Sequence, residues 1–362
     1  MKSEKQLTLR ILINSTPWHE VAPRTYGGIE SFCANLAKGL DALGAEVGIV
    51  SPGNLNIDGD HNIIHFQSLR QSANQNYSQP EPLIARHNAF IDALRSTKWD
   101  CVSDHTLIGS QMASLTSTPA VLTAHRIMDE QYRALYGAIS RHTPIVAISN
   151  RQAELAVDVN ITTVIHHGID TDVYRPTSHP SDDYLVFLGS MTQFKGAHIA
   201  IEASRQSGYP LIIAAKCQEQ GELNYFEEFI SPKLGNDVTW IGEVGGTDKI
   251  NLLANASGLI FPVRWEESFG LVIIEALSCG TPVIAFNRGA VPEIITNERT
   301  GYVTQDLKSM VKAIEHIDQI SRSTCRKEAL ERFDYRAMAS SYLATFTKSI
   351  ARYHSTNMLQ NL

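Results

Sequence analysis

The sequence has no Cys-x-x-Cys pair, and its five cysteines lie far apart along the chain, at Cys33, Cys101, Cys217, Cys279 and Cys325. This spacing excludes a zinc ribbon and argues against a disulfide framework, so we expect reduced thiols in a cytoplasmic protein. Basic residues are not in excess either, because the net charge is −7. A surface that binds nucleic acid is therefore not expected.

Long apolar runs are also missing, since none approaches the roughly 18 residues that a transmembrane helix needs. The first residues, MKSEKQLTLRILINS, include basic side chains but neither the apolar segment nor the cleavage site of a signal peptide. We expect no membrane span, and peripheral contact with a membrane surface stays open. A Walker loop and a His-Glu-x-x-His motif are both absent, which argues against the common nucleotide hydrolases and zinc proteases.

Two Asp-x-Asp spacings are present, Asp58–Asp60 and Asp170–Asp172, and such pairs hold divalent ions in one class of sugar transferases. The first pair lies in the turn NIDGD and the second in a linker, where aspartates commonly make local turn hydrogen bonds. Neither follows a strand in a way that would direct both carboxylates at a nucleotide. We therefore expect no metal site and no cofactor.

What the sequence does contain is two series of strands alternating with helices, in a chain of 362 residues, 43% of them hydrophobic. The first series has the strand-like segments LRILINS, VGIVSPG, DCVSDH, PAVLTAH, IVAISN and TTVIHHG. The second has DYLVFLGS, PLIIAAK, VTWIGEV, GLIFPV and TPVIAF, after the Pro-containing linker DTDVYRPTSHPSDD. Because parallel strands need crossover helices, the pattern predicts an α/β protein with two Rossmann-like parallel-sheet domains facing one another.

The segment PVRWEESFGLVIIE carries the clearest chemistry. It predicts a strand, a short loop and a helix that begins at residue 269, with Ser268 as the N-cap. In a parallel sheet such a loop lies where ligands bind, and the first N–H groups of the helix are suited to an anion. Those groups belong to Phe269, Gly270 and Leu271. Glu267 would then lie just outside the helix and Glu275 about two turns inside it; the alternative is a capped helix with two solvated glutamates.

Glu267 and Glu275, with seven residues between them, resemble the Glu-x7-Glu motif of the retaining family 4 glycosyltransferases. The resemblance continues in order along nearly the whole chain, in YGGIE, VIHHGID, FLGSMTQFKG, WIGEVG, RGAVPEII and the closing FDYRAMASSYLATF. It is strongest to short bacterial members that act in antibiotic or polysaccharide pathways.

This resemblance implies the GT-B fold, with an acceptor domain over residues 1–172 and a donor domain over 173–344. Residues 345–362 would form a helix that packs back on the first domain. The implied activity is retaining, metal-independent transfer of a hexosyl group from a nucleoside diphosphate sugar to a hydroxyl acceptor. The product would be a glycan, a glycolipid or a natural product, and UDP-sugars are slightly preferred over GDP-sugars.

The resemblance also assigns roles to individual residues. Catalytic roles fall to Glu267, Lys195 and His125, with Lys195 as the cation that meets the diphosphate. The family has a second cation, an arginine, where this chain has Ser190. Lys216, at the end of PLIIAAK, either replaces that arginine or is an ordinary surface lysine.

The remaining implied roles concern substrate binding. The acceptor is expected beside Asp104 and His105, at the end of a first-domain strand. The donor-binding set is Gly27, Gly28, Ser190, Lys216, Glu243, Val244, Phe269, Gly270, Leu271 and Glu275. Two other functions stay open. One is an epimerase or phosphorylase with the same fold; the other is a non-catalytic sugar-nucleotide binder, which the serine at position 190 suggests.

Overall fold

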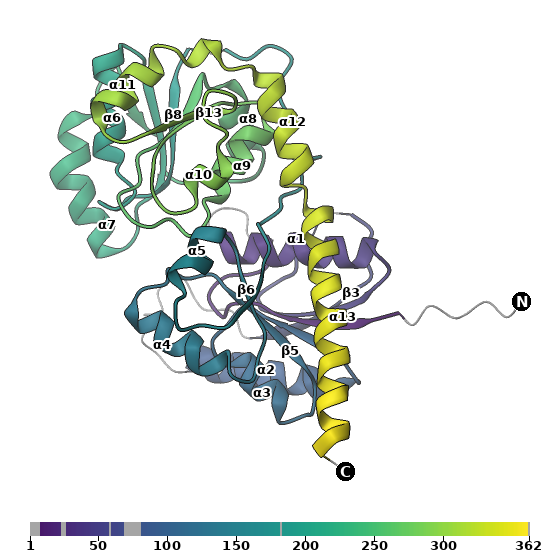
Figure 1. The fold of residues 1–362 in the computed structure, drawn as a ribbon. Coiled ribbons are helices and arrows are strands. Elements are labelled where there is room, and N and C mark those ends of the chain that lie inside the picture. The colour runs from purple at the N-terminus through teal and green to yellow at the C-terminus, as the bar shows by residue number, and fades with distance from the viewer. Residues whose placement is uncertain (1–7, 23–26, 58, 69–80, 182, 361–362) are drawn as a thin grey trace, which may run out of the picture.

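The computed structural model describes residues 8–22, 27–57, 59–68, 81–181 and 183–360, which form two α/β domains (Figure 1). Every paired strand in the described residues is parallel to its neighbour, with the order β3-β2-β1-β4-β5-β6-β7 in the first domain. These strands are β1 (Arg10–Asn14), β2 (Glu46–Pro52), β3 (Ile63–Ser68), β4 (Cys101–Asp104), β5 (Ala120–Ala124), β6 (Ile145–Ala147) and β7 (Ile161–Val164).

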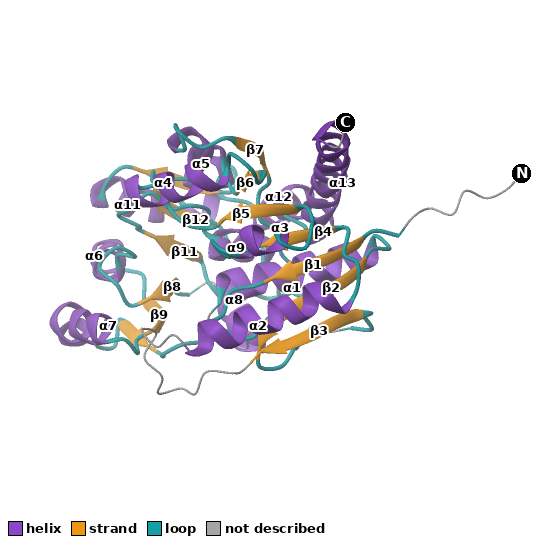
Figure 2. Ribbon diagram, turned by 90° about the horizontal axis from the view of Figure 1, so that it is seen from below, coloured by secondary structure: helices purple, strands orange, loops and turns teal. Residues whose placement is uncertain are grey.

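Helices connect these strands and cover the first sheet. In α1 (Gly28–Ala42), Phe32, Leu36 and Leu40 recur at helical spacing and are fully buried, so this face packs on the sheet. Figure 2 shows β1, β2 and β3 side by side, with α1 and α2 beside them. The other helices are α2 (Glu81–Ser96), α3 (Gly109–Ser114), α4 (Glu130–Ile139) and α5 (Asn150–Leu155).

The second domain has a six-stranded sheet in the order β10-β9-β8-β11-β12-β13. Its strands are β8 (Leu185–Ser190), β9 (Leu211–Lys216), β10 (Val238–Trp240), β11 (Gly258–Phe261), β12 (Val283–Phe286) and β13 (Gly301–Thr304). Its helices are α6 (Ala197–Ser207), α7 (Gln220–Tyr225), α8 (Gly246–Asn255), α9 (Leu271–Ser278), α10 (Val291–Ile294), α11 (Leu307–Ile314) and α12 (Arg322–Arg332). The prediction of two Rossmann-like parallel-sheet domains is therefore confirmed.

The chain passes between the domains twice, and the two passages are hydrogen-bonded to each other. The N–H of Ile169 donates to the carbonyl of Phe333 at 2.9 Å, and the N–H of Tyr335 donates to Ile169 at 3.0 Å. From there α13 (Tyr335–Gln360) runs back along the first domain, the yellow helix of Figure 1, and packs against α1. Tyr342 and Phe346 of α13 are fully buried in the first-domain core. The crossing helix expected at residues 345–362 is thus one continuous helix from Tyr335.

None of the described helices has the combination of length and apolar character that crossing a membrane requires.

Candidate functional site

A cavity of about 900 Å³ lies between the two domains, at the carboxyl ends of both sets of parallel strands. In parallel sheets this edge is where ligands bind. The cavity brings together all but one of the site residues predicted from the sequence: Gly27, Gly28, His105, His125, Ser190, Lys195, Lys216, Glu243, Val244, Glu267, Phe269, Gly270, Leu271 and Glu275.

Asp104 is the exception. Its side chain is fully buried and does not line the cavity. One carboxylate oxygen accepts from Asn14 at 2.8 Å and the other from the N–H of Ser110 at 2.6 Å. Asp104 therefore holds the end of β4 and the start of α3 together, and the structure gives it no contact with an acceptor in the cavity.

A mostly buried ion pair lies in the second-domain wall. Lys195, in the turn between β8 and α6, places Nζ 2.7 Å from Glu267 Oε2. The same oxygen accepts the indole N–H of Trp265 at 2.9 Å, and Nζ lies 4.8 Å from the centre of the Trp265 ring. The Lys195 and Glu267 side chains are only 19% and 11% exposed, so their positions are fixed before any ligand arrives. Trp265 was not among the residues predicted for the site, although it stands in the segment singled out for it.

The helix beside this pair begins later than predicted. α9 starts at Leu271, and its N-cap is Gly270, with φ of +95° and no side-chain hydrogen bond. Ser268 is therefore not the cap, because the chain turns through a left-handed conformation that glycine adopts most readily. Glu275 consequently lies about one turn inside the helix, not two. Gly270, Leu271 and Val272 line the cavity together with Lys195, and with no side-chain cap at Gly270 the first N–H groups of α9 are suited to an anion.

Gly289, in the segment RGAVPEII, supports the loop that carries Glu267. A Cβ at Gly289 would lie 2.1 Å from the carbonyl oxygen of Glu267, and φ is +56°. The next residue, Ala290, donates its N–H to that same carbonyl at 2.8 Å. Only glycine permits this approach, so RGAVPEII positions the Glu267 backbone from the neighbouring strand connection.

Glu275 is held by two residues that were not predicted for the site. Its Oε1 accepts from Lys249 Nζ at 2.7 Å and from the Tyr174 hydroxyl at 2.8 Å. Burial alone would lower the pKa of Lys249, but the Glu275 carboxylate raises it above its usual value, so the lysine is charged. Tyr174 comes from the linker and Lys249 from α8, and nothing in their local sequence indicated a role at this carboxylate.

Lys216 stands directly beside Ser190, because the two residues are register partners on β9 and β8. Its Nζ lies 2.8 Å from Glu219 Oε1 and 3.3 Å from Glu222 Oε1. Burial lowers the pKa of Lys216, but these carboxylates outweigh it and the net pKa is raised. The lysine therefore places a positive charge beside Ser190, which is itself uncharged. This charge also forms ion pairs with two acidic side chains.

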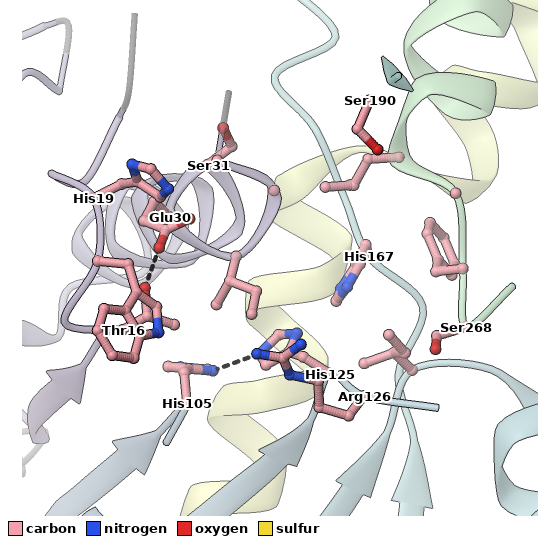
Figure 3. Close-up of a pocket in the computed structure, with 18 of the residues that line it drawn as sticks. Thr16, His19, Glu30, Ser31, His105, His125, Arg126, His167, Ser190 and Ser268 are labelled. Carbon is pink, nitrogen blue, oxygen red and sulfur yellow. Dashed lines mark hydrogen bonds between the residues drawn. The ribbon is translucent and has the colours of Figure 1, made fainter. Parts of the chain in front are cut away.

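The first-domain wall includes the N-terminus of α1 and the three histidines His105, His125 and His167. Gly28 meets α9 across the cavity, since a Cβ there would lie 3.4 Å from Leu271 Cδ1. Figure 3 shows His105 bonded to His125, with His167 nearby and Ser190 and Ser268 on the opposite side. Burial lowers the pKa of all three histidines, that of His125 to about 3, so they are neutral at physiological pH.

Glu293 of α10 joins the domains outside the cavity. Its carboxylate accepts the backbone N–H groups of Asn150 and Arg151 at 2.8 and 2.6 Å, at the start of α5 in the first domain. His166 Nε2 lies 3.1 Å from the same carboxylate. Arg151 also donates to Glu266 at 3.0 Å, next to Glu267. These contacts hold the two walls of the cavity against one another.

Both aspartates of the second Asp-x-Asp spacing pair with basic side chains. Asp170 pairs with Lys38 and Asp172 with Arg336 at 2.6 Å, both beside the passages between the domains. Asp58 lies outside the described residues. In the described part of the chain, no three His, Cys, Asp or Glu side chains are grouped as metal ligands. Metal independence stays a prediction.

Comparison with known proteins gives two adjacent family matches. The model of glycosyl transferases group 1 matches residues 171–339, and that of glycosyltransferase family 4 matches residues 26–173. The D-inositol 3-phosphate glycosyltransferase of Mycobacterium bovis is 24% identical, over 71% of this chain and 63% of the relative. This chain thus aligns with less than two thirds of the length of that curated relative.

Solved structures of glycosyltransferases share the fold. Sucrose-phosphate synthase from Thermosynechococcus elongatus has a TM-score of 0.79 and 20% identity, covering 95% of this chain and 100% of that one. A glycosyltransferase involved in avilamycin A biosynthesis has a TM-score of 0.71 and 22% identity, covering 95% and 98%. HepE of Anabaena, solved with UDP and glucose, has a TM-score of 0.73 and 19% identity, covering 94% and 99%. With adjacent family matches in both domains and this fold, the chain belongs to the family 4, group 1 glycosyltransferases of the GT-B fold.

Proposed function

We propose that this protein transfers a sugar from a nucleoside diphosphate sugar to a hydroxyl acceptor, with retention of the anomeric configuration. The observation that carries the proposal is the Lys195–Glu267 pair beside the uncapped start of α9, in a cavity between two parallel sheets. A cation and free helical N–H groups are suited to the diphosphate, and a fixed carboxylate beside them to the hydroxyls of the sugar.

The second domain supplies the donor site in this proposal. Lys195 and the N–H groups at the start of α9 bind the diphosphate. Glu275 accepts hydrogen bonds from the ribose hydroxyls through Oε2. Lys249 and Tyr174 both donate to Oε1, and Oε2 has no hydrogen bond among the described residues. Backbone groups at Glu243 and Val244, after β10, meet the nucleobase edge. UDP-sugars are the first candidates, since the similar HepE structures hold UDP or UDP-glucose.

The proposed mechanism depends on the charges that develop as the donor breaks down. When the bond to the diphosphate breaks, negative charge grows on the leaving group and positive charge on the sugar. Lys195 and the α9 N–H groups are already in place to stabilise the first charge without reorganising. The acceptor hydroxyl attacks from the face that the diphosphate leaves, and the departing phosphate takes its proton. Glu267 orients the donor sugar and forms no covalent bond.

Metal-independent catalysis is part of the proposal. Mg²⁺ would serve to neutralise the diphosphate, and here a lysine and backbone N–H groups are placed for that task. Lys216 adds a second cation beside Ser190, in place of the arginine that the family has there. No cofactor takes part, because the donor already carries a good leaving group.

Release of nucleoside diphosphate tests the proposal. Purified protein is first screened for stabilisation by UDP- and GDP-sugars, since a ligand that binds only the native state raises its melting temperature. The donor that stabilises it is then incubated with and without a panel of alcohol and sugar acceptors. Acceptor-dependent release supports glycosyl transfer. Epimerisation of the donor sugar without an acceptor would favour an epimerase. A donor that stabilises the protein but is never turned over would favour a binding protein.

A further inference from the structure

A line of three hydrogen-bonding side chains runs from the first-domain core to the cavity. It begins at Ser103, in β4, whose Oγ lies 3.0 Å from His105 Nε2. His105 Nδ1 then lies 3.0 Å from His125 Nε2, at the end of β5. Ser103 is fully buried and His105 is 5% exposed, whereas His125 lines the cavity. Both ring nitrogens of His105 are thus used inside the protein, which leaves none for an acceptor.

Each hydrogen bond in this line needs one donor and one acceptor. Both histidines are neutral, so each ring has one N–H and one bare nitrogen. Among the described residues, the Ser103 hydroxyl has only His105 as a hydrogen-bond partner. A buried hydroxyl that donates to nothing loses the full free energy of its hydration. Ser103 therefore donates, and His105 Nε2 accepts.

The positions of the other ring protons follow from this first assignment. With Nε2 accepting, His105 has its proton on Nδ1 and donates it to His125 Nε2. His125 Nε2 is then bare, so its proton is on Nδ1. Among the described residues, His125 Nδ1 has no hydrogen-bond partner, and this atom is accessible to solvent.

We propose that Ser103 and His105 fix the tautomer of His125, so that it presents an Nδ1–H donor to the cavity. His105 is then a positioning residue and not an acceptor-binding one. On the proposed function, on which this role rests, the donor faces an oxygen of the bound sugar or of the leaving diphosphate. The opposite tautomer would present a bare nitrogen, which repels those oxygens.

Nitrogen NMR of protein labelled with ¹⁵N-histidine tests the tautomer without turnover. Two-bond proton–nitrogen spectra distinguish Nδ1–H from Nε2–H rings, and the His125 signals are identified by their loss in His125→Gln. We expect the Nδ1–H form in the wild type and a mixture of both forms in Ser103→Ala. An Nε2–H ring in the wild type, or an unchanged ring in Ser103→Ala, would overturn the proposal.

Ser51→Ala is the matched control. Ser51 is also fully buried, in β2 of the same sheet, and its Oγ lies 3.0 Å from His65 Nε2, away from the cavity. Removing that serine breaks the same kind of bond and should leave the His125 ring in the Nδ1–H form. A change as large as that in Ser103→Ala would mean that the effect is a general loss of packing, and would overturn the proposal.

Kinetics distinguish positioning from structural support. His105→Ala should lower kcat by about 10- to 100-fold, the range for losing one buried hydrogen bond to a reacting group, with donor KM nearly unchanged. His105→Asn places an amide N–H near the former Nδ1 and should recover part of kcat. Equal losses in both folded variants would overturn the role of His105. Absence of any transfer by the wild type would instead overturn the proposed function, while the NMR result would still decide the tautomer.

Discussion

Removing the charge of Lys195 should slow turnover strongly without unfolding the protein. In the ground state Lys195 is paired with Glu267 at 2.7 Å, and both side chains are more than four fifths buried. Exposed ion pairs contribute about 0–1 kcal/mol, but a charge-assisted contact in a partly dry site contributes about 1.5–4 kcal/mol to the transition state. Since about 1.4 kcal/mol is tenfold in rate, Lys195→Ala should lower kcat/KM by roughly ten- to a thousandfold.

The assay is release of nucleoside diphosphate from the donor that the stabilisation screen identifies. Lys195→Arg keeps the charge and should recover part of the rate, although its planar fork fits the turn between β8 and α6 less well. Lys312→Ala, an exposed lysine of α11 that does not line the cavity, is the matched control and should be unchanged. A folded Lys195→Ala protein that turns over at the wild-type rate would refute the diphosphate role of Lys195.

Three further outcomes are expected. Turnover should survive excess EDTA, and loss of turnover that Mg²⁺ or Mn²⁺ restores would contradict the metal-free mechanism. Burial alone would raise the pKa of Glu293, but hydrogen bonds from His166 and two backbone N–H groups lower it below its usual value. The stability that these hydrogen bonds add is therefore present at neutral pH and is lost as the pH falls through the lowered pKa. The difference in melting temperature between the wild type and Glu293→Gln should therefore shrink as the pH falls below the usual range of a glutamate, and a difference that stays the same from neutral to strongly acidic pH would contradict this. Phe346→Ala empties a fully buried position and should lower the free energy of unfolding by about 3–5 kcal/mol in urea denaturation. Lys348 is exposed on the same helix, and Lys348→Ala should leave the free energy of unfolding unchanged. Equal values for the two variants would contradict the packing of α13.

The fold could be predicted where the apolar pattern is strong. In α1 the spacing of Phe32, Leu36 and Leu40 matches the buried face in the structure. Two strands were missed, β3 and β13, for different reasons. β3 is an edge strand in which only Ser68 is buried, so it lacks the apolar run of the central strands. β13 has only four residues, of which two are buried, and gives little periodicity.

The site could be predicted only in part, because some of its contacts join residues far apart in the sequence. Glu267 and Glu275 were found from their spacing, but Tyr174 reaches Glu275 across 101 residues and Lys249 across 26. The cap of α9 was misplaced because Ser268 is a common cap residue, whereas the close approach of Gly289 to Glu267 shapes the loop from another part of the chain. The family resemblance implied that Asp104 meets the acceptor, but its side chain is buried and accepts a hydrogen bond from Asn14 inside the first domain.

The most direct test of the central claim is the anomeric configuration of the first product. Proton NMR would follow the reaction of an α-linked UDP- or GDP-sugar with an acceptor that supports diphosphate release, in the presence of EDTA. We predict that the donor is consumed, that diphosphate appears at the same rate, and that the new glycosidic bond is α. A β-linked product would contradict retention by same-face attack, and a donor that is bound but never transferred would contradict glycosyl transfer itself.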